Sequence, residues 1–163
     1  MKVYRFSVMA IFLVVCLCLS NFVTQAAPGS ALKSSDLANL EGDWIGKYSA
    51  NQGETKLILN IQKVTTDGTI KAIFNFSALP TNPRVPSGSF KMIGKIDLNS
   101  RRVVMKGDEW IKRPSSYYTV DLDGYLTDDG SAIIGDVVNT GRFAIKKVIG
   151  TGRSPFGMDE IIK

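Results

Sequence analysis

The chain has 163 residues, with 20 Lys and Arg, 15 Asp and Glu, no His and two Cys. This length corresponds to one domain of ordinary size. The absence of His excludes an imidazole base, a His-containing catalytic triad and a His metal ligand. A hydrophobic share of 44% and a charged share of 21% are typical of a globular domain rather than of a disordered chain.

Residues 1–26 are predicted to be a secretory signal peptide. Lys2 and Arg5 form a charged start, Val8–Leu19 is an apolar run, and small residues lead to a cleavage site after Ala26. An uncleaved N-terminal anchor is the alternative. Cleavage removes both cysteines and leaves a mildly basic mature chain. We therefore expect a secreted or periplasmic protein without disulfides, without a nucleic-acid partner and without stable membrane insertion after cleavage.

The rest of the chain divides into three parts. Residues 27–40 are expected to be a linker and a short helical turn at Asp36–Leu40, with Ser34 or Ser35 as its N-cap. Across residues 41–149, apolar and polar residues alternate and turn residues recur about every ten positions, which is typical of an all-β sandwich or barrel. Residues 150–163 are expected to form a flexible C-terminal tail.

Eight antiparallel strands are predicted, each with one apolar face that packs against a core. They cover Trp44–Ser49, Thr55–Val64, Thr69–Ser77, Ser89–Leu98, Arg102–Lys106, Tyr117–Leu126, Ala132–Val138 and Arg142–Ile149. Their apolar faces predict a core that includes Trp44, Leu57, Leu59, Ile61, Phe74, Phe76, Phe90, Ile96, Val120, Leu122 and Phe143. Tyr118 is placed on the same inward face as Val120.

The connections between these strands differ in length. Thr66–Gly68, Asn99-Ser100 and Asp128–Gly130 have the composition of tight hairpin turns, in which Gly or Asn adopts a positive φ. Ala78–Gly88 and Gly107–Ser116 are long instead. If the strands simply run up and down, the two long loops share one end of the barrel and the short turns share the other. Long loops on a rigid scaffold are frequent binding sites.

The start of the first strand resembles that of a known family. Gly42-Asp43-Trp44 follows the short helical turn, and lipocalins begin with a similar Gly-x-Trp before eight up-and-down strands. The resemblance implies a lipocalin-like or calycin-like barrel whose long loops surround an open end. It also matches the family's late Arg, which lies against the early Trp, to Arg142. The family's Thr-Asp-Tyr turn is absent, and the stretch from Trp44 to Ile61 is also similar to a small β module of uncharacterised bacterial exported proteins.

The second long loop supplies most of the candidate binding residues. Trp110, Lys112, Arg113 and Tyr117 combine aromatic and basic side chains, which suit a cation–π pair, a sugar platform or an anchor for an anionic partner. The alternative is that Trp110 and Ile111 fold back as a lid on the barrel.

The first long loop adds two more candidates, Asn82 and Arg84. Three prolines stiffen this loop, and a stiff loop loses less entropy when it binds. Arg84 is expected to join Lys112 and Arg113 in one contiguous electropositive rim.

These observations favour an exported, non-catalytic binding module whose loops bind a macromolecular, anionic or sugar-bearing partner. Bulky inward side chains leave little room for an apolar ligand inside a small barrel, although a lipocalin-like carrier is an alternative. An inhibitor of a secreted enzyme and a carbohydrate hydrolase that uses Asp108 or Glu109 are further alternatives. We predict no catalytic residue, no cofactor and no metal site. Protein, glycan and small-molecule partners all stay open.

Overall fold

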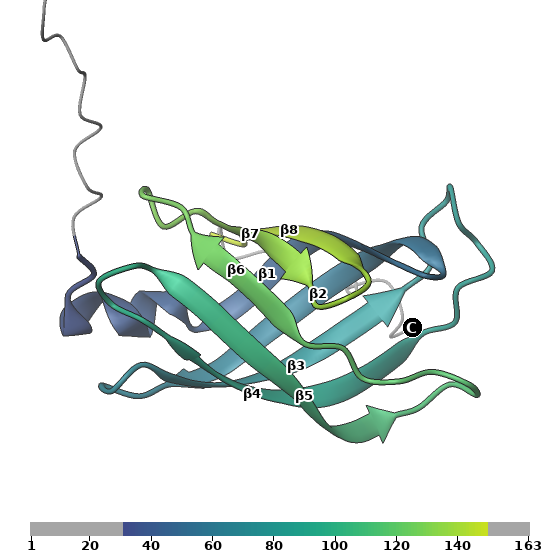
Figure 1. Cartoon of the computed structure of the whole chain (residues 1–163), viewed down its shortest axis with the longest axis horizontal. Coiled ribbons are helices and arrows are strands. Elements are labelled where there is room, and N and C mark those ends of the chain that lie inside the picture. The colour runs from purple at the N-terminus through teal and green to yellow at the C-terminus, as the bar shows by residue number, and fades with distance from the viewer. Residues whose placement is uncertain (1–30, 150–163) are drawn as a thin grey trace, which may run out of the picture.

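The computed structural model describes residues 31–149. They form a closed barrel of eight strands in chain order, each antiparallel to the next, and β8 pairs back with β1 (Figure 1). The predicted all-β, up-and-down barrel is therefore confirmed. The predicted signal peptide (1–26) and tail (150–163) lie outside the described residues.

The elements are the 3-10 helix η2 (Ser34–Leu40) and the strands β1 (Gly42–Ala50), β2 (Gly53–Val64), β3 (Thr69–Ser77), β4 (Gly88–Ile96), β5 (Arg102–Lys112), β6 (Leu122–Leu126), β7 (Ala132–Val137) and β8 (Gly141–Lys147).

The alternation in sequence places one side of each strand inside the barrel. In β2, Leu57, Leu59 and Ile61 are at most 2% exposed, whereas the residues between them are partly exposed. The predicted core residues are buried, with the exception of Val120, which is half-buried. No helix in residues 31–149 has the length and apolar character needed to cross a membrane.

Aromatic rings fill the middle of the barrel. The ring of Phe74 stacks on that of Phe90, with centroids 4.7 Å apart, and the ring of Tyr48 meets Phe74 edge-on at 5.2 Å. Phe76 continues the cluster, 6.3 Å from Phe74. These contacts place aromatic side chains of β1, β3 and β4 in the middle of the barrel.

β5 is longer than predicted. It continues to Lys112 instead of ending at Lys106, because its second half pairs with the start of β4, where Phe90 lies opposite Trp110. Trp110 is therefore a strand residue and not a loop residue. The long connection after β5 begins only at Arg113.

β6 is shorter than predicted, and it begins at Leu122 rather than at Tyr117. The backbone N–H of Gly107 donates to the Asp121 carboxylate at 2.9 Å, so a side chain replaces the backbone ladder at this point. The prediction that Tyr118 faces the core is wrong, since this side chain is 79% exposed.

Several smaller predictions are also corrected. β4 ends at Ile96 and β8 at Lys147, each two residues earlier than expected, while β1 begins earlier, at Gly42. Lys33, and neither Ser34 nor Ser35, is the N-cap of η2, and its N–H donates to Asp36. In the turn between β4 and β5, the positive φ belongs to Arg101 (58°), not to Asn99.

η2 covers one end of the barrel, which we call the closed end. Its Leu37 and Leu40 are buried, and Nε1 of Trp44 donates to the Leu40 carbonyl at 2.9 Å. The ammonium of Lys147 donates to the carbonyls of Asn39 and Glu41 and lies 5.3 Å from the centroid of the Trp44 ring. Burial lowers the pKa of Lys147 from its ordinary value.

The match of Arg142 to the late Arg of lipocalins is wrong. Lys147 lies opposite Trp44 in the pairing of β1 with β8, whereas Arg142 lies towards the other end of β8. Arg142 instead forms an ion pair with Asp136 at 3.6 Å. The cation against the early Trp is thus a lysine in this chain.

Two short turns at the closed end have the same hydrogen-bond pattern. In each turn, an aspartate is followed by a glycine of positive φ. The aspartate carboxylate accepts a hydrogen bond from the hydroxyl of the residue two positions before the aspartate. It also accepts hydrogen bonds from the N–H and the hydroxyl of the residue two positions after the aspartate. These sets are Thr65, Asp67, Gly68 and Thr69 in the turn between β2 and β3, and Thr127, Asp129, Gly130 and Ser131 in the turn between β6 and β7.

These turns predict a pH dependence of stability. The hydrogen bonds lower the pKa of Asp67 and of Asp129 from 3.8 to about 2. The unfolded chain therefore binds more protons below about pH 4, so the stabilisation is present above this pH and is lost as the pH falls towards 2. We expect the urea midpoint to fall over this range. The double variant Asp67→Asn, Asp129→Asn should show a smaller fall, and an equal fall in both proteins would contradict the assignment.

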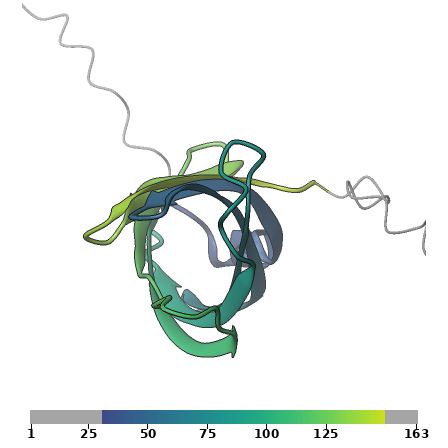
Figure 2. The ribbon, with the colours of Figure 1, turned by 90° about the vertical axis from the view of Figure 1, so that its right-hand side faces the viewer.

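The two long connections lie at the same end, as predicted. Phe76 pairs with Gly88 and Phe90 with Trp110, so the β3–β4 and β5–β6 connections leave the barrel together. We call this the loop end. It lies on the right in Figure 1, and Figure 2 looks into it.

Candidate functional site

Trp110 lies at the loop end, at the rim of the barrel. It is half-buried, and its ring meets Phe90 edge-on at 5.1 Å and Phe76 at 6.3 Å. These contacts agree with the lid alternative for Trp110. Ile111 does not share that role, because it points outward and is 53% exposed.

Tyr117 is a second partly buried aromatic residue at the loop end. Its ring stacks on Phe76, with centroids 5.5 Å apart and an interplanar angle of 14°. Its backbone carbonyl accepts a hydrogen bond from Nε of Arg113 at 3.2 Å. Tyr117 therefore packs against the core and also positions the neighbouring guanidinium.

Arg113 lies near two aromatic rings. Its Cζ is 6.0 Å from the ring centroid of Trp110 and 5.9 Å from that of Tyr118, within the range of a cation–π contact. We call Trp110, Arg113 and Tyr118 the Arg113 cluster. Both Arg113 and Tyr118 are exposed, so the cluster faces solvent.

Tyr118 is the site residue that sequence reasoning missed. The signal was the pair Tyr117-Tyr118 itself, because consecutive residues of an extended segment point to opposite sides. If Tyr117 packs against the core, Tyr118 must point outward. The strand predicted over Tyr117–Leu126 placed Tyr118 on the inward face, whereas the structure places Tyr118 on the outside.

Both basic and acidic side chains lie on the strand that leads to the Arg113 cluster. Lys112 is exposed at the end of β5. The nearby Glu109 is already paired with Lys91, with 2.7 Å between nitrogen and oxygen, and this contact keeps the pKa of Glu109 below its usual value. Lys112 and Arg113 are thus two exposed cations at this edge, and the exposed carboxylate of Asp108 lies on β5 as well.

The β3–β4 connection is anchored at two points. Nδ2 of Asn82 donates to the backbone carbonyls of Gln52 (2.8 Å) and Glu54 (3.1 Å), which ties the loop to the β1–β2 hairpin. Val85 is buried, at 7% exposure. Asn82 is thus a structural anchor, and Arg84 between these two points is exposed.

The structure brings the six predicted site residues to one end of the barrel, and the contiguous rim of Arg84, Lys112 and Arg113 stays a prediction. Trp110, Lys112, Arg113 and Tyr117 lie where β5 ends and the β5–β6 connection begins. Asn82 and Arg84 belong to the loop that is anchored on the β1–β2 hairpin.

Within residues 31–149, no group of three or more His, Cys, Asp or Glu side chains is arranged to hold a metal ion. Every buried side-chain nitrogen and oxygen in this part of the chain has a hydrogen-bond partner. Comparisons with protein-family models, with curated proteins and with solved structures gave no match.

Proposed function

We propose that the protein is an exported, non-catalytic binding module whose loop end recognises an anionic or sugar-bearing partner. The observation that carries this proposal is the position of Arg113 near the rings of Trp110 and Tyr118. Only its Nε–H is used by a described residue, the carbonyl of Tyr117. The outer N–H groups of the guanidinium are therefore available to a ligand while the group itself is already oriented.

This arrangement suits an oxyanion. A guanidinium binds a carboxylate or a sulfate with two parallel hydrogen bonds, and its planar shape makes that contact specific. The exposed ring of Tyr118 adds an apolar face on which a sugar ring packs well. Because the rings hold Arg113 in place, less side-chain entropy is lost on binding.

The filled interior favours binding at the surface over the carrier alternative. The stacked rings of Phe74 and Phe90 occupy the space in which a lipocalin holds its ligand. The ion pair of Glu109 with Lys91 supports a non-catalytic role, because a general acid needs a raised pKa and the pKa of Glu109 is lowered. We propose a lipocalin-like or calycin-like origin of the barrel, with Lys147 in place of the family's Arg. We further propose that a signal peptide directs export to the periplasm or the cell exterior.

The test compares three polysaccharides as probes: dextran sulfate, polygalacturonate and neutral dextran. Arg113→Gln is expected to weaken binding of at least one of the two anionic polymers about tenfold, and Tyr118→Ser by a similar factor. The unfolding midpoint should change little, since both side chains are exposed. Binding is measured by biolayer interferometry at fixed salt.

Lys71→Gln is the matched control, because Lys71 is an exposed cation on the outer face of β3, away from the loop end. An equal loss of binding in Lys71→Gln would show that charge alone is responsible. Binding of neutral dextran that depends on Tyr118 but not on Arg113 would favour a sugar partner. Anionic binding that neither variant changes would contradict the proposed site.

A further inference from the structure

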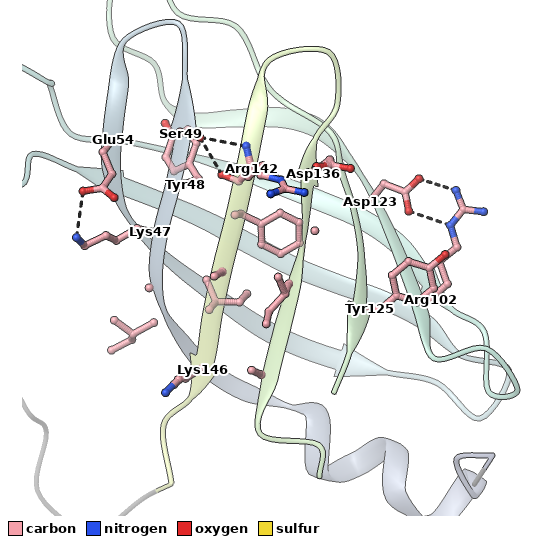
Figure 3. A pocket seen from close by; sticks show the side chains of 18 residues that line it. Lys47, Tyr48, Ser49, Glu54, Arg102, Asp123, Tyr125, Asp136, Arg142 and Lys146 are labelled. Atoms are coloured by element: carbon pink, nitrogen blue, oxygen red, sulfur yellow. Dashed lines mark hydrogen bonds and ion pairs between the residues drawn. The ribbon is translucent and has the colours of Figure 1, made fainter. Parts of the chain in front are cut away.

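An open groove lies on the outside of the barrel, separate from the Arg113 cluster. It has a volume of about 830 Å³ and crosses the outer faces of β6, β7, β8 and β1 (Figure 3). This volume is within the range of sites that bind small molecules. None of the six loop-end residues discussed above lines it.

Two glycines among the residues that line the groove lie tightly against neighbouring strands. Gly46 and Gly135 occupy inward-facing positions of β1 and β7. A Cβ at Gly46 would collide with the Ala144 carbonyl, and one at Gly135 with the Asp123 carbonyl. Without side chains at these positions, the backbones of the neighbouring strands approach closely.

The floor of the groove is apolar. Tyr125 lies opposite Ile134 across β6 and β7, and Ile134 lies opposite Ala144 across β7 and β8. Tyr125 is 54% and Ile134 53% exposed. A solvated strand face normally carries polar residues, so a row of apolar side chains across adjacent strands indicates a ligand surface.

The charges at the rim are paired, with one exception. The pairs are Lys47 with Glu54 (3.0 Å), Arg102 with Asp123 (2.5 Å) and Arg142 with Asp136 (3.6 Å). Lys146 also lines the groove, and within residues 31–149 it has no carboxylate partner. Its side chain lies at the end of the groove nearer to the closed end (Figure 3).

We propose that this groove binds a free amphiphile with one carboxylate head and an unbranched alkyl chain. The carboxylate pairs with Lys146, and the chain lies over Ala144, Ile134 and Tyr125. Strand geometry separates the backbone of Lys146 from that of Tyr125 by about 12 Å, two residues along β8 and two strands across. The paired rim charges disfavour a polyanion, because one cation is left to neutralise.

The test uses decanoate below its aggregation concentration and isothermal titration calorimetry on the full mature chain. Ile134→Thr retains β propensity and is expected to weaken decanoate binding about tenfold. Lys146→Gln should weaken it about fivefold. Decanol should bind less tightly than decanoate, and decyltrimethylammonium least tightly, because the groove supplies a cation.

Matched controls lie on other strands. Ile93 is an outward isoleucine of β4 with 48% exposure, and Lys71 is an outward lysine of β3. Ile93→Thr and Lys71→Gln should leave decanoate binding unchanged. Arg113→Gln should also leave it unchanged, so this result is independent of the function proposed for the loop end.

Several results would overturn the inference. Absence of saturable decanoate binding would do so, as would equal losses in the groove variants and their controls. A dimer that Ile134→Thr dissociates, seen by analytical ultracentrifugation, would assign the groove to a second copy of the chain. Decanoate binding that appears only after residues 150–163 are removed would assign it to that segment. Co-sedimentation with phosphatidylglycerol vesicles that depends on Ile134, without binding of free decanoate, would assign it to a lipid surface.

Discussion

Replacement of Phe74 by Ala is expected to lower the free energy of unfolding by about 3–5 kcal/mol. The side chain is fully buried, and its ring contacts three other rings in the middle of the barrel: Phe90 at 4.7 Å, Tyr48 at 5.2 Å and Phe76 at 6.3 Å. Because these rings come from three different strands, their relaxation into the cavity is restricted, and most of the lost contact is not recovered.

Urea unfolding followed by circular dichroism measures the effect of Phe74→Ala. Ile93→Ala serves as the control, because Ile93 is a half-exposed residue on the outer side of β4. This substitution should lower the free energy of unfolding by less than about 1 kcal/mol. A loss below about 1 kcal/mol for Phe74→Ala would place this residue on the outer face and would shift β3 by one residue in register.

Trp44→Ala is expected to have an effect of at least the same size, about 3–5 kcal/mol, because the indole is fully buried. It also connects η2 to the barrel through the hydrogen bond from Nε1 to the Leu40 carbonyl, and its face is covered by the ammonium of Lys147. Its removal opens the closed end and exposes Leu37 and Leu40. We therefore expect the variant to lose protection of η2 amides from hydrogen exchange as well as global stability.

A second variant separates the hydrogen bond of Trp44 from its packing. Trp44→Phe keeps most of the ring contacts and should cost less than Trp44→Ala, with about 1–3 kcal/mol attributable to the unpaired Leu40 carbonyl. Trp110→Ala is the control for loss of an indole, and its half-buried position predicts a smaller effect than that of Trp44→Ala. If Trp44→Ala and Trp110→Ala cost the same, Trp44 is not the residue that holds the closed end together.

Local pattern predicted which side of most strands faces the core, while the up-and-down order of the strands was assumed. In Thr55–Ile61 and Thr69–Ser77, the alternation places Leu57, Leu59 and Phe74 on the inward face, because successive side chains of a strand point to opposite sides. The lengths of the connections then predict which loops share an end, since neighbouring strands are antiparallel. Both inferences need only nearest neighbours in the chain.

The positions of the candidate site residues depend on contacts between strands, which the alternation of apolar and polar residues does not predict. Pairing with β4, in which Trp110 lies opposite Phe90, extends β5 to Lys112. The β5–β6 ladder ends where the N–H of Gly107 donates to Asp121, and Tyr118 lies outward beside Arg113. The choice of Lys147 over Arg142 as the cation against Trp44 followed from the register of β8 on β1.

Residue types, alternation and turn chemistry by themselves determined an all-β sandwich or barrel and the inward face of most strands, whereas the up-and-down order was assumed and agreed with the resemblance to lipocalins. Only the tertiary structure decided the Arg113 cluster, the cation against Trp44 and the outer groove. The groove brings together strands far apart in sequence, and its lining includes Gly46 and Gly135, each of which lies against the backbone of a neighbouring strand. Such features arise from register and from close approach between strands, and a one-dimensional pattern of apolar and polar residues does not record either quantity.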